Sequence, residues 1–298
     1  MLPQQKEWEG TTGGGTFGQL FLFWLLNAIK VSFIYPTLFL IIPFYLLFGR
    51  KGYHAIYDYF HKRHKQSKFK SFISTFRNHL IFGQIVLDKF ALLAGNQDQF
   101  NIQVEGCDYF NELTTKEKGF IVASAHIGNF ELVGHCFKQH NKKINGIIFG
   151  GEAKNYQSQR IKSLQKANIQ LIPVSDDMSH LFTIKEALDK GEIITMPCDR
   201  LFGSTKKYIT PFLGTNASFP IGSFRLAAQL EVPVLVMFIM KEKGLNYHGY
   251  VYPLQALEND KSSVKKAEYL IKQYVDLLEK ILKRYPEQWF NYYNFWNT

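Results

Sequence analysis

Short apolar runs recur along the last two-thirds of the chain and alternate with segments of helical length. The apolar runs are residues 102–104, 120–123, 144–149, 171–174, 193–196 and 232–240. Polar-apolar stretches of helical length lie between them, at residues 155–167, 178–190 and 219–230. Short apolar runs that alternate with helices are typical of buried parallel strands. The pattern therefore predicts an α/β fold with a mixed, mostly parallel sheet flanked by helices.

Three further segments extend this prediction. Residues 71–94 have helical periodicity, residues 247–251 are a candidate strand, and residues 262–284 read as a long amphipathic helix that closes the fold. The chain has 298 residues, of which 46% are hydrophobic. That length suits one large domain with an attached element and is short for two full domains.

Residues 20–48 form an apolar segment in which Lys30 is the only formally charged residue. The segment exceeds the roughly 20 residues that a membrane-spanning helix needs. The preceding residues are acidic and glycine-rich, which is unlike a secretory signal peptide. Pro36 and Pro43 would kink a helix, so a re-entrant or interfacial arrangement and a buried core helix stay open. We expect residues 1–50 to be an N-terminal membrane anchor and residues 51–298 to be the α/β domain.

Basic residues follow this apolar segment closely, at Arg50 and Lys51 and within residues 61–70. Such residues favour the cytoplasmic side, so we expect the α/β domain on the cytoplasmic face of the membrane. The formal net charge of +10 favours an anionic partner, such as an anionic membrane surface or an acidic carrier protein. No zinc-finger or RNA-binding motif is evident, so we expect no nucleic-acid partner. The 3 cysteines lie far apart, without a CxxC pair, which suits a reducing compartment.

The stretch GFIVASAHIGNFELVG, residues 119–134, combines a strand, a loop and the start of a helix. His126 lies just past the end of the strand. Asn129 is a natural N-cap, which places Glu131 in the first helical turn. With His126 in the loop and Glu131 in that turn, the two side chains can face one another. A carboxylate bonded to one ring nitrogen fixes the tautomer and leaves the other nitrogen to take a proton.

A base and its orienting carboxylate, without an adjacent activated nucleophile, indicate that the substrate supplies the nucleophile. Ser124 is two residues away, but no Gly-x-Ser-x-Gly elbow surrounds it, so a covalent acyl-enzyme through Ser124 is a minor alternative. By spacing alone, His126 and Glu131 also fit a structural loop histidine beside a capping carboxylate.

The segment SAHIGNFE resembles the His-x4-Asp/Glu motif of the lysophospholipid acyltransferase superfamily, and more closely its lipid A late acyltransferase (lauroyl/myristoyl acyltransferase) branch. Residues 196–239 resemble that branch's Asp-containing strand end, phenylalanine-proline-glycine loop, alanine-rich helix and following strand. YPEQWF, residues 285–290, resembles its C-terminal Pro-Glu-Gln signature. The resemblance covers most of the chain and implies a glycerolipid acyltransferase-like α/β fold with an N-terminal membrane helix. The ending NYYNFWNT and the N-terminal GTTGGG depart from that branch and leave the acceptor open.

The resemblance implies transfer of a fatty acyl group from an acyl carrier protein or coenzyme A thioester to a hydroxyl of a membrane lipid or glycolipid. His126 is the expected base and Glu131 its orienting carboxylate, at the cytoplasmic face of a bacterial inner membrane. We expect no cofactor beyond the thioester co-substrate, and no metal. Asp199 and Arg200, at the end of the strand over residues 193–196, are the expected region for binding the oxyanion or a substrate group. Arg160 and Lys206 are further candidates for binding anionic groups of the substrates.

Other readings stay open. The acceptor can be lipid A, a lysophospholipid, an amino-acid lipid or a polyene pigment lipid. A metal-dependent lipid hydrolase that uses His126, Glu131 and Asp199 is an alternative of another class, although no His-Glu-x-x-His motif is present. A non-enzymatic membrane scaffold is a third reading.

Overall fold

The computed structural model describes residues 15–132, 142–149, 168–175, 177–201, 206–257 and 260–297. The helix that we predicted over residues 155–167 lies outside these ranges.

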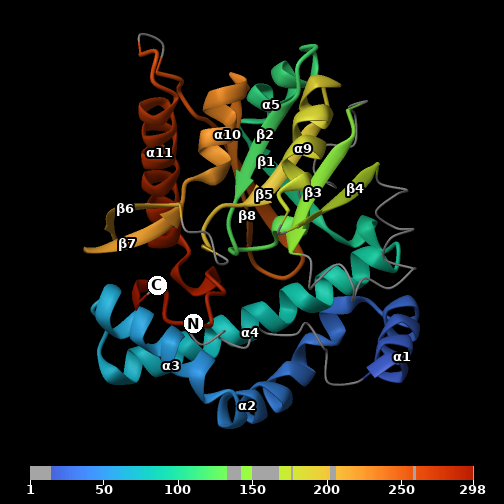
Figure 1. The fold of residues 1–298 in the computed structure, drawn as a ribbon. Helices are drawn as coiled ribbons and strands as arrows, with labels where there is room; N and C mark the ends of the chain where they lie inside the picture. The colour runs from blue at the N-terminus through green and yellow to red at the C-terminus, as the bar shows by residue number, and fades with distance from the viewer. Residues whose placement is uncertain are drawn as a thin grey trace.

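Seven strands form the central sheet, in the order β1-β9-β8-β2-β5-β3-β4 (Figure 1). Every neighbouring pair is parallel except β8 and β9, which pair antiparallel. The mixed, mostly parallel sheet that the alternating pattern predicted is therefore confirmed. The strands span Asn101–Glu105 (β1), Phe120–Ser124 (β2), Ile144–Phe149 (β3), Ile169–Val174 (β4), Ile193–Pro197 (β5), Val234–Lys241 (β8) and Asn246–Pro253 (β9).

Both faces of the sheet are buried. Along β2, Ile121 and Ala123 pack into one hydrophobic cluster, whereas Phe120 and Val122 pack into another. Helices α9, α10 and α11 contribute to the first cluster, and α5 contributes to the second. Strands covered on both faces carry apolar residues at every position, which explains why they appear in the sequence as continuous apolar runs. The helices span Cys107–Thr114 (α5), Ser179–Asp189 (α9), Gly222–Leu230 (α10) and Ser263–Arg284 (α11).

A two-stranded hairpin, β6 (Lys207–Phe212) and β7 (Thr215–Pro220), is an element that the sequence reading missed. The helix expected over residues 219–230 begins only at Gly222 (α10), because residues 219 and 220 belong to β7. Leu213 and Gly214 form the turn, and both have positive φ, as a two-residue type I′ hairpin requires. The Leu213 N–H donates to the Glu279 carboxylate of α11, which fixes the turn against that helix.

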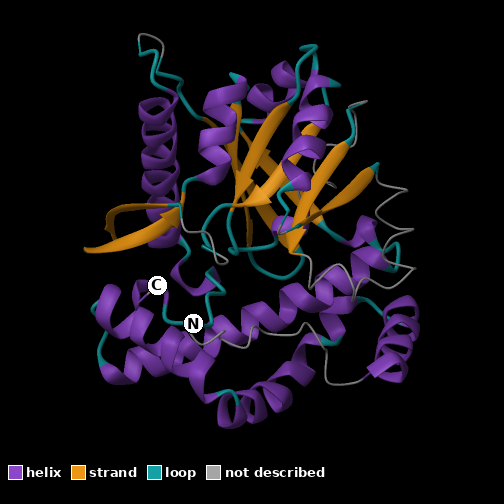
Figure 2. Ribbon diagram, in the orientation of Figure 1, coloured by secondary structure: helices purple, strands orange, loops and turns teal. Residues whose placement is uncertain are grey.

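The N-terminal residues form a helical layer along one edge of the α/β unit, as Figure 2 shows. The apolar segment is divided at Lys30, whose ψ of 137° is extended, into α1 and a second helical stretch, Val31–Phe48. Among the described residues, Val31–Phe48 is the candidate for crossing a membrane by length and composition. The layer comprises α1 (Gly15–Ala28), the 3-10 turns η1 (Val31–Phe33) and η2 (Tyr35–Thr37), α2 (Leu38–Phe48), α3 (Arg50–Asp58), the π-helical turn η3 (Tyr59–Arg63) and α4 (Lys68–Leu93).

The second helical stretch packs lengthwise against α4. Its residues Val31, Ile34, Leu38 and Ile42 are buried at helical spacing and form a cluster with Leu87 and other residues of α4. The expected boundary after residue 50 falls at the start of α3, whose first residue is Arg50. Helix α4 joins this layer to the rest of the molecule, because it also contacts the C-terminal Pro286–Gln288 turn, η6.

Candidate active site

His126 lies at the carboxyl end of β2, in the middle of the sheet. Asp199 follows β5, which pairs with β2 in parallel. The carboxyl ends of parallel strands meet at one edge of a sheet, and that edge is where open α/β folds bind ligands. Two residues that are 73 positions apart in the chain are thereby brought into contact.

Asp199 binds His126 with both of its carboxylate oxygens. The His126 Nδ1 lies 2.7 Å from Oδ1, and the His126 backbone N–H donates to Oδ2 over 3.1 Å. The indole Nε1 of Trp289 also donates to Oδ2, over 3.2 Å. Asp199 is completely buried, whereas the His126 side chain retains 17% of its exposure. The His126 ring therefore reaches the surface, while the carboxylate bonded to it does not.

The electrostatics keep Asp199 ionised. Burial by itself raises the pKa of this carboxyl. The charge and hydrogen bond of His126, the charge of Arg200 and the Trp289 hydrogen bond together outweigh burial and lower the pKa to about 2. An ionised carboxylate on Nδ1 fixes the ring tautomer and stabilises the imidazolium that forms when Nε2 takes a proton. The arrangement suits general-base catalysis on a substrate that reaches Nε2.

The loop that carries His126 is clamped by the chain on both sides. The backbone N–H of Phe290 donates to the His126 carbonyl over 3.0 Å, and Ile127 forms a β-bridge with Trp289. On the other side, the Asn129 N–H donates to the Ile239 carbonyl of β8 over 2.8 Å. These bonds fix the backbone on both sides of His126.

The C-terminal Pro-Glu-Gln segment is itself anchored. The Gln288 amide donates to the Lys241 carbonyl over 2.7 Å and accepts from the Lys241 N–H over 2.9 Å. The Asn78 amide of α4 donates to the carbonyls of Glu287 and Trp289, over 3.0 and 2.9 Å. The sequence reading noted this segment as a resemblance but assigned it no role. Trp289, which directly follows this segment, donates from its indole to Asp199. The two residues are far apart in the sequence, so no short motif indicates this contact.

The structure places three of the residues that we expected to bind substrate. Asp199, expected to bind substrate, instead lies buried beneath His126, because its oxygens are occupied by the ring, the His126 backbone and Trp289. Arg200 donates from Nη2 to the Phe290 carbonyl over 2.9 Å, and its guanidinium lies 5.7 Å from the Tyr293 ring centre. Lys206 is exposed at the start of β6.

Two predicted residues cannot be placed as side chains. Glu131 belongs to the short 3-10 helix Phe130–Leu132, which directly follows the His126 loop, but its side chain is outside what the structure describes. Arg160 lies outside the described residues. We expect Glu131 to bond to one ring nitrogen of His126, and in the structure the Nδ1 atom is bonded to Asp199.

Ser124, the minor alternative nucleophile, is buried at the end of β2. Its carbonyl accepts from the Tyr274 hydroxyl over 2.9 Å and from the Cys198 N–H over 2.8 Å. Among the described residues, no group of three or more His, Cys, Asp and Glu side chains is arranged to hold a metal ion.

Comparisons with known proteins give a family. The model of the family described as bacterial lipid A biosynthesis acyltransferase matches residues 75–298. No curated protein matches the chain. Among solved structures, the chain is similar to the 1-acyl-sn-glycerophosphate (LPA) acyltransferase PlsC from Thermotoga maritima, with 14% sequence identity and a TM-score of 0.41. That similarity covers 90% of this chain and 95% of the other.

Proposed function

The chain belongs to the bacterial lipid A biosynthesis acyltransferase family and acts as an acyltransferase on lipids, and from this premise we propose the donor, the acceptor and the residues of the reaction. The donor is an acyl thioester, on acyl carrier protein or coenzyme A, and the acceptor is a hydroxyl of a membrane lipid or glycolipid of the lipid A type. The observation that carries the proposal is the bond between His126 and the buried, ionised Asp199.

In the proposed reaction, His126 Nε2 removes the proton of the acceptor hydroxyl as its oxygen attacks the thioester carbonyl. A C–O bond forms, the tetrahedral intermediate collapses, and the C–S bond breaks. The departing thiolate takes the proton back from the imidazolium, which Asp199 stabilises throughout. The acceptor is the nucleophile, so the enzyme needs no acyl-enzyme through Ser124.

Glu131 remains a proposed catalytic residue, because it directly follows the loop that carries the base. For Arg200, Lys206 and Arg160 we propose contacts with anionic groups of the substrates. Arg200 is the strongest of these candidates. It directly follows Asp199 in the chain, and its guanidinium lies over the Tyr293 ring. The net charge of +10 fits an acidic carrier protein as the donor and an anionic membrane surface.

The membrane would contact the N-terminal layer. The face of Val31–Phe48 that is turned away from α4 exposes large apolar side chains, among them Leu40 at 73% and Phe44 at 64%. An exposed apolar face of this size marks a membrane or protein contact. Because the opposite face lies along α4, we propose that this stretch lies in the membrane interface at the cytoplasmic face of the inner membrane rather than crossing it alone.

The neighbouring charges support an interfacial position. Arg50 and Lys51 directly follow this stretch and are exposed, and Lys68 and Lys70 are exposed at the start of α4, which packs along it, so these cations can meet anionic headgroups. Phe69 is 76% exposed between two of these lysines. Apolar side chains flanked by lysine and arginine are the pattern of interfacial membrane helices.

Paired charges in the apolar face test the membrane contact. We expect the double variant Leu40→Asp and Phe44→Asp to leave the membrane fraction and appear in the soluble fraction, because a carboxylate in this position opposes burial in lipid. The matched control is Phe182→Asp, which alters an equally exposed phenylalanine on α9. If the double variant sediments with membranes as the wild type does, this face is not the contact.

Comparative lipid mass spectrometry tests the reaction. Cells would carry the wild type, His126→Ala or an empty vector, and we expect one lipid class to lose a single acyl mass in both His126→Ala and the vector control. That mass names the acceptor among lipid A, lysophospholipid, amino-acid lipid and polyene pigment lipid. If His126→Ala cells match wild-type cells while vector cells do not, His126 is not the base.

A further inference from the structure

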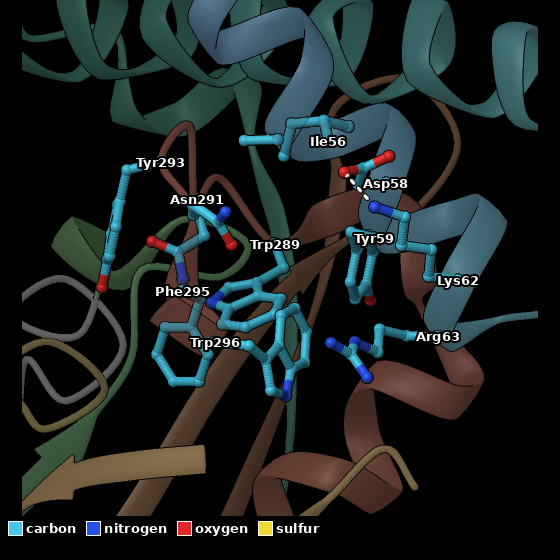
Figure 3. Close-up of a pocket in the computed structure, with 12 residues that line it drawn as sticks. Ile56, Asp58, Tyr59, Lys62, Arg63, Trp289, Asn291, Tyr293, Phe295 and Trp296 are labelled. Carbon is cyan, nitrogen blue, oxygen red and sulfur yellow. Dashed lines mark hydrogen bonds and ion pairs between the residues drawn. The ribbon is translucent and has the colours of Figure 1, made fainter. Parts of the chain in front are cut away.

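A polar cavity lies between the N-terminal layer and the C-terminal tail, and His126 does not line it. Its volume is about 120 Å³. Tyr59, Lys62 and Arg63 of η3 line one wall, and Trp289 and Trp296 of the tail line the other (Figure 3). His126 and Asp199 do not line it, although Trp289 contributes its ring to the cavity and its Nε1 to Asp199.

Arg63 supplies positive charge to this cavity. Its guanidinium lies 4.3 Å from the Trp296 ring centre, and within the described residues its hydrogen bond goes to the Thr215 hydroxyl. One such bond uses one of the five N–H donors of an arginine. Lys62 is exposed and paired with Asp58 at 2.7 Å, so the local balance of these three side chains is one positive charge.

The walls also contain polar atoms that the protein does not satisfy. The Tyr59 hydroxyl and the Trp296 Nε1 are buried without a hydrogen-bond partner among the described residues. Asn291 also lines the cavity, and its side-chain amide is buried without a well-aligned hydrogen bond among the described residues. The amide lies close to the Tyr293 hydroxyl. Burial raises the pKa of Tyr59 well above its usual value, so its hydroxyl is a neutral donor. Such groups are rare in folded proteins, because each costs stability unless something binds it.

The backbone at this wall is irregular as well. Residues Tyr59–Arg63 form a π-helical turn between α3 and α4. Single π-helical turns are uncommon and are found frequently at functional sites, because they redirect side chains that a regular helix would turn elsewhere. The turn brings the buried hydroxyl of Tyr59 and the cation of Arg63 to the same cavity, and Figure 3 shows the hydroxyl directed toward the arginine.

We propose that this cavity binds a phosphate group. A guanidinium supported by an aromatic ring is a preferred partner of phosphate oxygens, and the Tyr59 hydroxyl and the Trp296 Nε1 are further donors beside the cavity that the described residues leave without a partner. The cavity is of the size of a small oxyanion with a few waters. The phosphate can be free, or it can belong to the headgroup of an anionic phospholipid, because η3 is part of the layer that carries the exposed apolar face.

Occupation of the cavity would bear on the base through a single side chain. The Trp289 ring forms part of the cavity wall, while its Nε1 holds the carboxylate that orients His126. The site is separate from the reacting groups, so its test does not depend on the proposed reaction.

Calorimetric titration of inorganic phosphate into the full chain tests the site, in a phosphate-free detergent and at constant ionic strength. We expect saturable binding to the wild type and at least about tenfold weaker binding to Arg63→Gln, because a charge-assisted hydrogen bond is lost. Tyr59→Phe should also weaken binding, without lowering the unfolding temperature of the ligand-free protein, since it removes an unsatisfied hydroxyl. Lys190→Gln, which alters an exposed lysine that pairs with Glu186 of α9 and does not line the cavity, is the matched control and should bind as the wild type does.

A second arm identifies the source of the phosphate. It compares cosedimentation with vesicles that contain phosphatidylglycerol and with vesicles that carry an equal charge as fatty-acid carboxylate. A loss by Arg63→Gln and Tyr59→Phe on phosphatidylglycerol alone assigns a headgroup, and a loss in calorimetry alone assigns the free anion. His126→Ala should bind phosphate like the wild type even if it is inactive. The proposal is overturned if both cavity variants match the wild type with every probe.

Discussion

At the scale of single residues, the ring of His126, the proposed base, is bonded to a carboxylate from a distant part of the chain. Asp199 is completely buried and accepts hydrogen bonds from the ring, the backbone of His126 and Trp289. Five positions separate His126 from Glu131, and the resemblance to the His-x4-Asp/Glu motif favours Glu131 as the orienting residue. Asp199 is 73 positions away from His126, so no spacing rule connects the two.

Amide variants of the two carboxylates decide between them. We expect Asp199→Asn to lower kcat by a factor on the order of 10³, because the amide holds the wrong tautomer and leaves the imidazolium without a counter-charge. Glu131→Gln should lower kcat by less if Asp199 is the main orienting residue. Acyl transfer by purified protein is the measurement, with Asp189→Asn, which alters an exposed carboxylate of α9, as the control. Full activity of Asp199→Asn together with an inactive Glu131→Gln would return the orienting role to Glu131.

At the scale of structural elements, the loop after β2 depends on close backbone contact with β8. Gly128 has a φ of 51° and donates its N–H to the Gln288 carbonyl over 3.0 Å. A Cβ on Gly128 would lie 2.0 Å from the Ile239 carbonyl oxygen, which leaves no room for a side chain. Glycine is therefore required where the loop passes between the end of β8 and the C-terminal segment.

Gly128→Ala tests this clamp. We expect a loss of about 2 to 5 kcal/mol in the free energy of unfolding, from the unfavourable φ and the clash together, and a fall in kcat as His126 is displaced. Gly222→Ala in α10 is the matched control, because its Cβ would meet no heavy atom within 4 Å. Chemical denaturation and acyl transfer measure the two effects. Equal stability of the two variants would contradict the clamp.

At the scale of the whole molecule, a buried ion pair joins the N-terminal layer to the sheet. Lys241 Nζ of β8 lies 2.5 Å from the Asp88 carboxylate of α4, and both side chains are almost fully buried. The hydroxyls of Tyr35 and Tyr247 also donate to Asp88. Burial lowers the pKa of Lys241, although the charge of Asp88 and its hydrogen bond oppose that shift. The backbone of Lys241 holds Gln288, so the same residue contacts the clamp of the active-site loop.

Single and double replacements of the pair measure its role. We expect Lys241→Met alone to cost about 3 to 5 kcal/mol in the free energy of unfolding, because Asp88 would be buried without a counter-charge. The double variant Lys241→Met and Asp88→Leu should recover most of that loss. Lys190→Met, in an exposed pair with Glu186, should leave the stability unchanged. If both buried variants are equally unstable in denaturant titrations, the unpaired charge is not the cause.

The parts of the protein that local pattern determines were predictable from the sequence. Strands buried on both faces carry continuous apolar runs, so residues 120–123 and 193–196 predicted β2 and β5, and the long amphipathic stretch predicted α11. The hairpin of β6 and β7 was missed because neither strand carries a continuous apolar run: β6 alternates between exposed and half-buried residues, and β7 mixes polar and apolar residues. Its turn also places Leu213 at positive φ, which the residue type does not indicate.

The candidate site divides in the same way. His126 was found because its type and its position after a strand are local properties, and the short YPEQWF segment was recognised by resemblance. Its partners are not local, since Asp199 and Trp289 reach His126 only when β5 pairs with β2 and the C-terminal segment returns to the end of β8. A hydrogen bond depends on distance in space, and parallel strand order sets that distance without leaving a spacing in the sequence. The sequence by itself therefore determined which residue is the candidate base, whereas the tertiary structure decided which carboxylate is bonded to its ring.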